Sequence, residues 1–258
     1  MILENYLSGT PLRDGFPGLT MEEARAVQDE FVLELKKILG EEAGYKAALT
    51  NPEARKRFGA TEPLRGVLLR GMLVKSGAWL PVDFGARPMC EGDLLVRVRD
   101  DGINNAKDLK EVLVSLESVI PFIELPDMVY SDDINPTAPM IVAINAGARY
   151  GVLGEPIPIT PGPGWEERLR DMTVEIRDSN GALLADGRGS ALMGHPLNVV
   201  LWIRDSLRSE GKTLKKGDIL SLGGITRMLP IRPGMKIKAR YTGLLPEGAV
   251  EVSVGFAD

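Results

Sequence analysis

The sequence predicts one α+β domain built on a mixed or antiparallel β-sheet. The chain has 258 residues, enough for one sizeable hydrophobic core. Three segments show apolar residues at helical spacing, and several others show the alternation that is typical of strands. These segments do not alternate as regular βαβ units. We expect residues 1–60 to form a helical N-terminal segment packed on the core and residues 61–258 to form a β-rich domain, together making one structural unit.

The first helix is expected at Met21–Leu39. Thr20 and Glu23 have the spacing of a capping box at its start. Apolar residues then recur at helical spacing until Gly40, where the pattern ends.

Two further helices are expected later in the chain. One pattern runs from about Ala106 and should end before Pro121, which lacks the N–H that a helix interior requires. The other begins after His195 and ends near Gly211.

Strands are expected mainly in the C-terminal third of the chain. Alternation over residues 172–176 stops at Asn180-Gly181 and resumes at residues 182–184, a pattern that indicates a β-hairpin. Two more alternating runs lie at residues 237–241 and 250–256. The end of the chain is therefore predicted to be sheet.

Composition excludes several functional classes. A net charge of -5 argues against a basic nucleic-acid-binding surface. No apolar run approaches the roughly 20 residues that a membrane helix needs, and residues 1–13 lack the pattern of a secretory signal. Neither a P-loop nor a GxGxxG motif is present. We expect a cytoplasmic protein with no nucleic-acid or membrane partner.

Three acidic residues stand in apolar, strand-like surroundings. Glu91 and Asp93 are two positions apart, so both would leave the same face of a strand. Paired acids often mark a solvated strand edge, but the run Leu94–Val96 that follows is too apolar for one. Glu124 follows a similar run at 120–123. Three such carboxylates favour a shared divalent cation, Mg²⁺ or Mn²⁺.

A lysine and the single histidine are the other candidates for chemistry. Lys46 lies within the apolar segment 44–49, so we expect it to be partly buried with a partner, either for acid–base work or as a structural ion pair. His195 precedes a proline and is expected to hydrogen-bond at a helix start, although a Ser-His-Asp triad would have to use it. Cys90 should face away from Glu91 as a buried apolar residue, and a Cys/His zinc site is excluded.

Several segments taken in order carry a family resemblance. They are GYKAALTN at 44–51, EPLRGVLLRGM at 62–72, RPMCEGD at 87–93, IPFIELPD at 120–127, GHPLNVVLWI at 194–203 and KKGDILSLGGIT at 215–226. As a set they resemble the 2-keto-4-pentenoate hydratase and 4-oxalocrotonate decarboxylase group of the fumarylacetoacetate hydrolase-like superfamily. The resemblance covers nearly the whole chain. Two features depart from the family pattern: Asp93 stands where glutamate is usual, and Gly92 and the turn at 99–102 are not typical of such a site.

This resemblance implies a fold, a cofactor and a set of site residues. The implied fold is a fumarylacetoacetate hydrolase C-terminal-like mixed β-sheet roll with flanking helices, assembled as a homo-oligomer. The implied cofactor is Mg²⁺ or Mn²⁺, and Lys46 would transfer a proton or orient the substrate. The implied metal ligands are Glu91, Asp93 and Glu124, and the implied substrate-binding residues are Gly223, Gly224 and Thr226.

The implied activity is that of a metal-dependent lyase on a 2-oxo or 2-hydroxydienoate acid, with the β-rich domain as the catalytic one. A hydratase of 2-hydroxypenta-2,4-dienoate type, acting in aromatic catabolism, is the first expectation. The adjacent glycines 223 and 224 resemble the decarboxylases, so a 4-oxalocrotonate-type decarboxylase is the alternative. A carbon–carbon bond hydrolase would need a water-activating base, for which His195 is the only histidine. A non-catalytic binding protein is disfavoured by Lys46 and the three acids.

Overall fold

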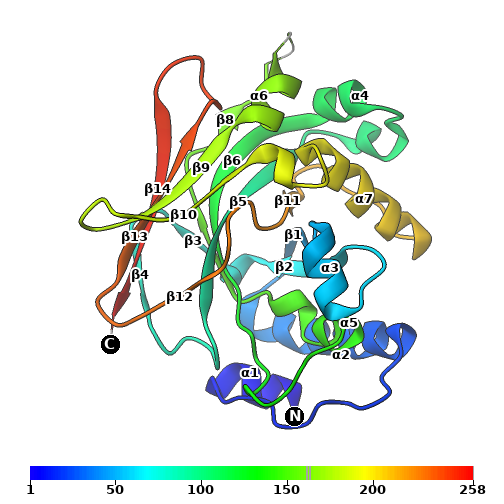
Figure 1. Ribbon diagram of the computed structural model, residues 1–258. Coiled ribbons are helices and arrows are strands. Elements are labelled where there is room, and N and C mark those ends of the chain that lie inside the picture. Colours follow the sequence, from blue (N-terminus) through cyan, green and yellow to red (C-terminus); the bar gives the residue numbers. More distant parts are fainter. Residues whose placement is uncertain (161, 163, 258) are drawn as a thin grey trace.

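The fold is centred on two mixed β-sheets with helices around the larger one (Figure 1). It is described from a computed structural model that covers residues 1–160, 162 and 164–257. The α+β class and the mixed-sheet architecture expected from the sequence are confirmed.

The larger sheet has nine strands. Its path runs β2 (Leu64–Leu69), β1 (Glu42–Ala48), β11 (Ile219–Ser221), β5 (Met89–Val98), β6 (Leu116–Leu125), β7 (Tyr150–Leu153) and β3 (Leu73–Lys75), with β12 (Leu229–Pro230) beside β5 and β8 (Ile157–Pro158) beside β6. The sheet is mixed because β1 pairs with β11 in parallel, whereas β5 is antiparallel to both β11 and β6.

The smaller sheet has five strands, β10 (Leu183–Arg188), β9 (Thr173–Asp178), β13 (Lys236–Thr242), β14 (Ala249–Ala257) and β4 (Ala78–Pro81), in that order. The expected hairpin is confirmed, because β9 and β10 pair in antiparallel register around Asn180-Gly181. Strands β13 and β14, which were also expected, form an antiparallel pair.

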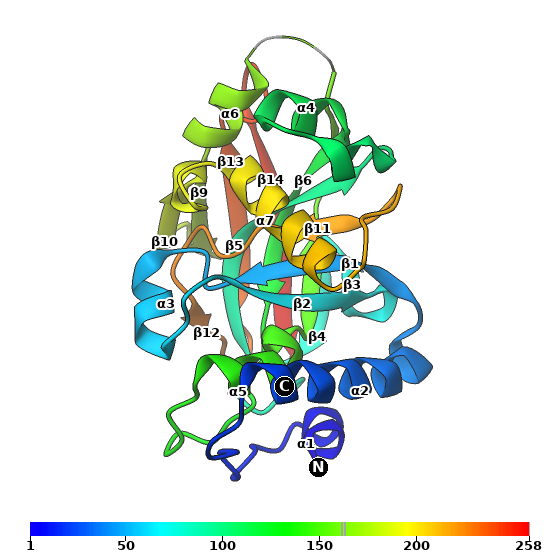
Figure 2. The same cartoon turned by 90° about the vertical axis from the view of Figure 1, so that its right-hand side faces the viewer.

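Helices cover the larger sheet at both ends (Figures 1 and 2). At the lower end in both views lie α1 (Ile2–Ser8), α2 (Met21–Leu39) and α5 (Ala138–Ala143); at the upper end lie α4 (Leu109–Val114) and α6 (Trp165–Asp171). Helix α7 (Pro196–Ser209) lies below these two and crosses the middle of the molecule in Figure 2. The short α3 (Pro52–Phe58) lies between the two ends, and 3₁₀ turns occur at Arg70–Met72, Asp101–Asn105, Asn145–Gly147 and Gly189–Ala191. No helix in the described ranges combines the length and apolarity needed to cross a membrane.

The first and third predicted helices are confirmed, and the second is wrong in extent. The capping box of α2 is present, with the Thr20 hydroxyl accepting from the Glu23 N–H at 3.2 Å. Helix α4 ends at Val114, and the rest of the segment up to Leu125 is strand β6. Almost every side chain of β6 is buried on both faces, so its apolar residues show no strand alternation that could be read from the sequence.

A buried tyrosine joins the two sheets close to the acidic residues of β5 and β6. Tyr241 of β13 is fully buried, and its hydroxyl donates to the Asp93 carbonyl at 2.7 Å. The same hydroxyl accepts from the Phe122 N–H at 3.1 Å. A side chain of the smaller sheet therefore fixes β5 and β6 of the larger sheet where both carry carboxylates.

The N-terminal segment contributes to the larger sheet as well as to its helical cover. Helix α2 packs against α5, and β1, which also lies within residues 1–60, pairs with β2 and β11. The division of the chain near residue 60 stays a prediction.

Candidate active site

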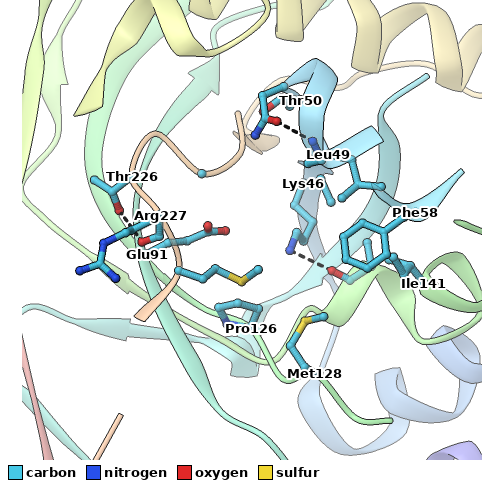
Figure 3. A pocket seen from close by; sticks show the side chains of 16 residues that line it. Lys46, Leu49, Thr50, Phe58, Glu91, Pro126, Met128, Ile141, Thr226 and Arg227 are labelled. Carbon is cyan, nitrogen blue, oxygen red and sulfur yellow. Dashed lines mark hydrogen bonds between the residues drawn. The ribbon is translucent and has the colours of Figure 1, made fainter. Parts of the chain in front are cut away.

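A cavity of about 190 Å³ opens beside the larger sheet. Strand β1, helix α3, strand β5, helix α5 and the loop after β11 all contribute to its lining. Lys46 from β1 and Glu91 from β5 extend into it from opposite sides (Figure 3). Charged groups from two strands thus face one cavity.

Glu91 and Glu124 are brought together by the pairing of β5 with β6. They are direct Cα partners in the antiparallel register, and directly opposed side chains of such a pair are neighbours on one face. Asp93, two residues along β5, is the partner of Phe122. The strand expected to carry Glu91 and Asp93 is confirmed as β5, and Glu124 is buried in the apolar surroundings expected for it.

Lys46 is buried and paired, as the sequence predicts. Its side chain is about 3% exposed and forms an ion pair with Glu124. Its ammonium group also donates to the carbonyl oxygen of Ala146 at 3.0 Å. The ammonium is therefore held by two acceptors at the end of the cavity that holds Glu91.

The Ala146 carbonyl is presented by an unusual turn. Both Asn145 and Ala146 have positive φ angles, 55° and 53°, a region that non-glycine residues rarely occupy. The buried Asn145 side chain stabilises the turn: its Oδ1 accepts from the Val67 N–H at 2.7 Å and from Gln28 Nε2 at 3.1 Å. Its Nδ2 donates to the Val67 carbonyl at 2.8 Å. Helix α2, strand β2 and this turn together determine the position of the Lys46 acceptor.

Glycines leave room for the charged side chains at two places. A Cβ on Gly224 would lie 2.2 Å from Glu91 Oε2, and a Cβ on Gly66 would lie 2.9 Å from Lys46 Cγ. A Cβ on Gly66 would also lie 2.7 Å from the Asn145 carbonyl oxygen, so glycine is needed there, whereas a side chain at position 224 would displace the Glu91 carboxylate.

Asp93 is held differently from the other two acids. Its Oδ2 accepts a hydrogen bond from the Ser221 hydroxyl, and its Oδ1 accepts from the Leu94 N–H. Ser221 is also the Cα partner of Lys46 in the β1–β11 pair. The shorter acid at position 93 is thus tied to the neighbouring strand β11.

Burial and mutual repulsion make the acids harder to ionise. The pKa of Glu91 is raised well above its usual range by loss of solvent and by the Glu124 charge, partly offset by Lys46. The pKa of Asp93 is raised by the same two causes, and the Ser221 hydrogen bond opposes the rise. The ionised form of the cluster is therefore unfavourable, and a further cation bound there would stabilise it.

The donor chemistry of this cluster fits a hard divalent cation. Three carboxylates are accompanied by one ammonium, and oxygen donors suit Mg²⁺ and related ions. In the conformation described for residues 1–160, 162 and 164–257, no three Asp, Glu, His or Cys side chains form a metal-binding cluster. In this conformation Ser221 holds Asp93, and Lys46 pairs with Glu124. The assignment of the three acids as ligands stays a prediction.

The predicted substrate-binding loop borders the cavity. Gly224 and Thr226 line it, and the Thr226 hydroxyl accepts from the Gly92 N–H at 3.0 Å, which fixes the loop to β5. Gly223, with φ 98°, packs against Thr50 instead. Their contact with substrate stays a prediction.

His195 and Cys90 have the structural roles expected for them. His195 caps α7: its Nδ1 accepts from the Leu197 N–H at 3.1 Å, and its Nε2 bonds the Glu166 carbonyl at 2.9 Å. Cys90 is fully buried in the core. In the part of the chain that the structure describes, neither His195 nor Cys90 is among the residues that line the cavity.

Sequence reasoning missed the apolar wall of the cavity and the Asn145–Ala146 turn. The wall includes Phe58, Met128 and Ile141, which come from three separate segments. No local pattern indicates that these segments meet. The segment INAGA at 144–148 does contain a signal, because asparagine tolerates positive φ and a glycine follows closely.

Comparison with known proteins supports the family resemblance. No family model matches the chain. The chain is 27% identical over 234 residues to 2-keto-4-pentenoate hydratase of Paraburkholderia xenovorans, covering 91% of this chain and 85% of that protein. It is 24% identical over 233 residues to 4-oxalocrotonate decarboxylase of Pseudomonas putida, covering 89% and 84%.

Solved structures give the same result. The structure is similar to 4-oxalocrotonate decarboxylase from Pseudomonas putida G7, complexed with magnesium and adipate, with a TM-score of 0.86, 26% identity and coverage of 99% of this chain and 94% of that one. A fumarylacetoacetate hydrolase family protein from yeast shares the fold at a TM-score of 0.56 and 13% identity, covering 84% and 93%. The resemblance that the sequence motifs indicate is therefore confirmed.

Proposed function

We propose, from this similarity to the 2-keto-4-pentenoate hydratases and 4-oxalocrotonate decarboxylases, that the protein is a divalent-metal-dependent lyase. Its substrate is a 2-oxo or 2-hydroxydienoate acid, and its reaction is hydration of the 2-hydroxypenta-2,4-dienoate type, as in aromatic catabolism. A 4-oxalocrotonate-type decarboxylase is the second candidate, since such enzymes are among the relatives.

One observation carries the proposal. Glu91 and Glu124 are paired across β5 and β6, and Lys46 reaches the same point from β1. This places buried carboxylates and an ammonium group together beside a cavity. A structural ion pair alone would not require three acids or an adjoining space.

The three acids are proposed to hold the metal ion, Mg²⁺ or Mn²⁺. The chemistry that such an ion supplies is Lewis-acid stabilisation of the negative charge that develops at the 2-oxo group. Glu91 borders the cavity directly, whereas Asp93 and Glu124 lie behind it and are almost fully buried. Exclusion of water at this end strengthens every charge interaction with the substrate.

Lys46 is proposed to transfer a proton at the substrate or to orient it. Its ammonium has a fixed position because Glu124 and the Ala146 carbonyl both bind it. A cation in this place also attracts the carboxylate of an entering acid. In the hydratase, ketonisation of the dienol moves a proton to carbon, and water then adds to the conjugated system.

The wider setting of the enzyme is also proposed. We assign it to the cytoplasm, as the sequence features indicate, and propose a homo-oligomer, as the family resemblance implies. Sedimentation of the purified protein measures the assembly; a monomer at all concentrations would contradict this assignment.

The reaction is tested with purified protein, Mg²⁺ or Mn²⁺, and two substrates. 2-Hydroxypenta-2,4-dienoate is followed by its dienol absorbance, and 4-oxalocrotonate by CO₂ release, each with a chelator control. Chelator-sensitive loss of the dienol without CO₂ supports the hydratase, and CO₂ from the dicarboxylate supports the decarboxylase. Inactivity with both, in protein shown to bind the metal, would overturn the lyase proposal for these substrates.

The metal site is tested by Glu91→Gln. We expect metal binding, measured by calorimetry, and turnover to be lost together, because the neutral amide is a poorer ligand than a carboxylate. Glu117→Gln is the matched control, since Glu117 lies on β6 near its start and is about half exposed. Unchanged turnover in Glu91→Gln would contradict the assignment.

A further inference from the structure

Apart from the charged side chains, much of the cavity lining is apolar. Leu49, Phe58, Pro126, Met128 and Ile141 all line it, and in Figure 3 they lie on the Lys46 side of the cavity and below it. They come from the loop after β1, from α3, from the segment after β6 and from α5. A ligand that places its polar head near Glu91 therefore has its remaining atoms among hydrocarbon side chains.

Charged groups in the lining offer no partner for a second carboxylate. Of the described lining residues, only Lys46, Glu91 and Arg227 are charged. Lys46 is paired with Glu124. Arg227 is exposed, donates to the Leu184 carbonyl at 2.6 Å and points away from the cavity in Figure 3. A carboxylate buried against this wall would lose its hydration without an ion-pair partner, which is costly.

Helix α3 carries three basic residues; Lys56 and Arg57 are exposed, and Arg55 is half-buried and tethered. Arg55 Nη1 donates to the carbonyls of Leu49 and Thr50, both at 3.0 Å. The Arg57 guanidinium lies 5.3 Å from the centre of the Phe58 ring. Helix α3 is itself anchored at its start, where Asn51 Oδ1 accepts from the Ala54 N–H at 2.8 Å. The half-buried Phe58 ring is therefore held at the cavity by a capped and tethered helix.

We infer that the enzyme selects a monocarboxylate whose far end is a short apolar chain, and that Phe58 is the residue that determines this specificity. The inference rests on the proposed function, because it takes the polar end of the cavity as the site of the 2-oxo acid group. It favours an alkyl-substituted dienoate over the dicarboxylate 4-oxalocrotonate. It thus separates the two candidate reactions by substrate and not by mechanism.

Three unreactive 2-oxo acids test the inference by calorimetry with Mg²⁺ present. 2-Oxohexanoate ends in a methyl group, 2-oxohexanedioate has a carboxylate at the same end of a six-carbon chain, and pyruvate has no extended tail. We expect 2-oxohexanoate to bind at least about tenfold more tightly than the diacid, the scale of discrimination that small groups give in apolar pockets.

Two variants assign the selectivity to the wall. In Phe58→Ala the ratio of affinities for 2-oxohexanoate and pyruvate should fall several-fold. Met128→Lys adds a cation to the wall. In this variant the affinity for 2-oxohexanedioate should rise relative to the affinity for 2-oxohexanoate. Leu33→Ala is the control, since Leu33 is 59% exposed on α2. Circular dichroism and thermal unfolding confirm that each variant is folded; if Phe58→Ala is not, Met128→Lys carries the test.

Each outcome decides between the two proposals. Equal or tighter binding of the diacid by the native protein overturns the apolar specificity but leaves the lyase proposal standing. An unchanged 2-oxohexanoate to pyruvate ratio in folded Phe58→Ala overturns the role of Phe58. If none of the three acids binds although Mg²⁺ does, both the specificity and the proposed 2-oxo acid site are wrong.

Discussion

Single residues determine where the Lys46 ammonium lies. Asn145 is fully buried and bridges Gln28 and Val67, which keeps the adjacent Ala146 in its left-handed conformation. The Ala146 carbonyl then meets Lys46. Backbone strain at a functional site persists only where surrounding contacts over-determine it. Here those contacts come from one amide side chain.

We expect Asn145→Ala to reduce both stability and catalysis. Loss of the amide leaves the half-buried Val67 N–H and carbonyl without their partner, so the free energy of unfolding should fall by about 1 to 2 kcal/mol, measured in urea. Because the Ala146 carbonyl is no longer held, kcat should fall more than KM rises. A folded variant with unchanged kcat would show that this turn does not position Lys46.

Asp93 shows how one methylene changes a contact. The shorter acid is bound by Ser221 on the next strand, while Glu91 on the same strand borders the cavity. The sequence predicted that all three acids share one cation, with Asp93 the shorter ligand. The structure distinguishes one that faces the substrate space from one that is tied into the sheet.

At the scale of elements, helix α7 explains the single histidine. His195 is its N-cap residue. The His195 ring also forms a hydrogen bond with the carbonyl oxygen of Glu166, the second residue of α6. It therefore joins two helices that cover the larger sheet. The carbon–carbon hydrolase alternative required His195 as a base, and this placement away from the cavity lining disfavours it.

His195→Ala tests this structural role. Loss of an N-cap acceptor should lower the free energy of unfolding by about 1 kcal/mol, with kcat and KM unchanged. His195→Asn, which keeps an N-cap acceptor, should recover part of the stability. A large loss of kcat in folded His195→Ala would revive a catalytic role for the histidine.

At the scale of the whole molecule, packing of the two sheets buries the acids, and burial disfavours their ionised forms. Tyr241 joins the smaller sheet to β5 and β6 beside Asp93. Burial raises the pKa values of Glu91 and Asp93, so folding of the metal-free protein is favoured by their protonated forms. That contribution is complete below the ordinary carboxyl pKa of about 4 and is lost as the pH rises through the raised values.

A bound divalent cation should reverse this dependence, because it requires the ionised carboxylates. We expect Mg²⁺ to raise the melting temperature, and to raise it more at about pH 8 than at about pH 5, measured by calorimetry with a matched chelator sample. At a concentration one hundred times Kd the stabilisation is about 2.7 kcal/mol. Glu91→Gln should abolish the shift at both pH values. An equal shift in that variant would contradict a metal site at Glu91.

The sequence by itself determined the local features and the chemistry available. Capping residues and helical spacing specified α2, an Asn-Gly turn specified the β9–β10 hairpin, and ordered motifs indicated the family. These signals are local, so they can be read along the chain. The predicted burial of Lys46 and Glu124 followed from their apolar neighbours in the same way.

Only the tertiary structure decided how these residues meet. Strand β6 was partly read as helix because burial on both faces removes alternation. The Glu91–Glu124 pair depends on strand register, the Lys46 acceptor on a turn about one hundred residues away, and the apolar wall on segments from α3, α5 and the chain after β6. Such contacts arise from packing of distant segments, and no local pattern encodes which segments become neighbours.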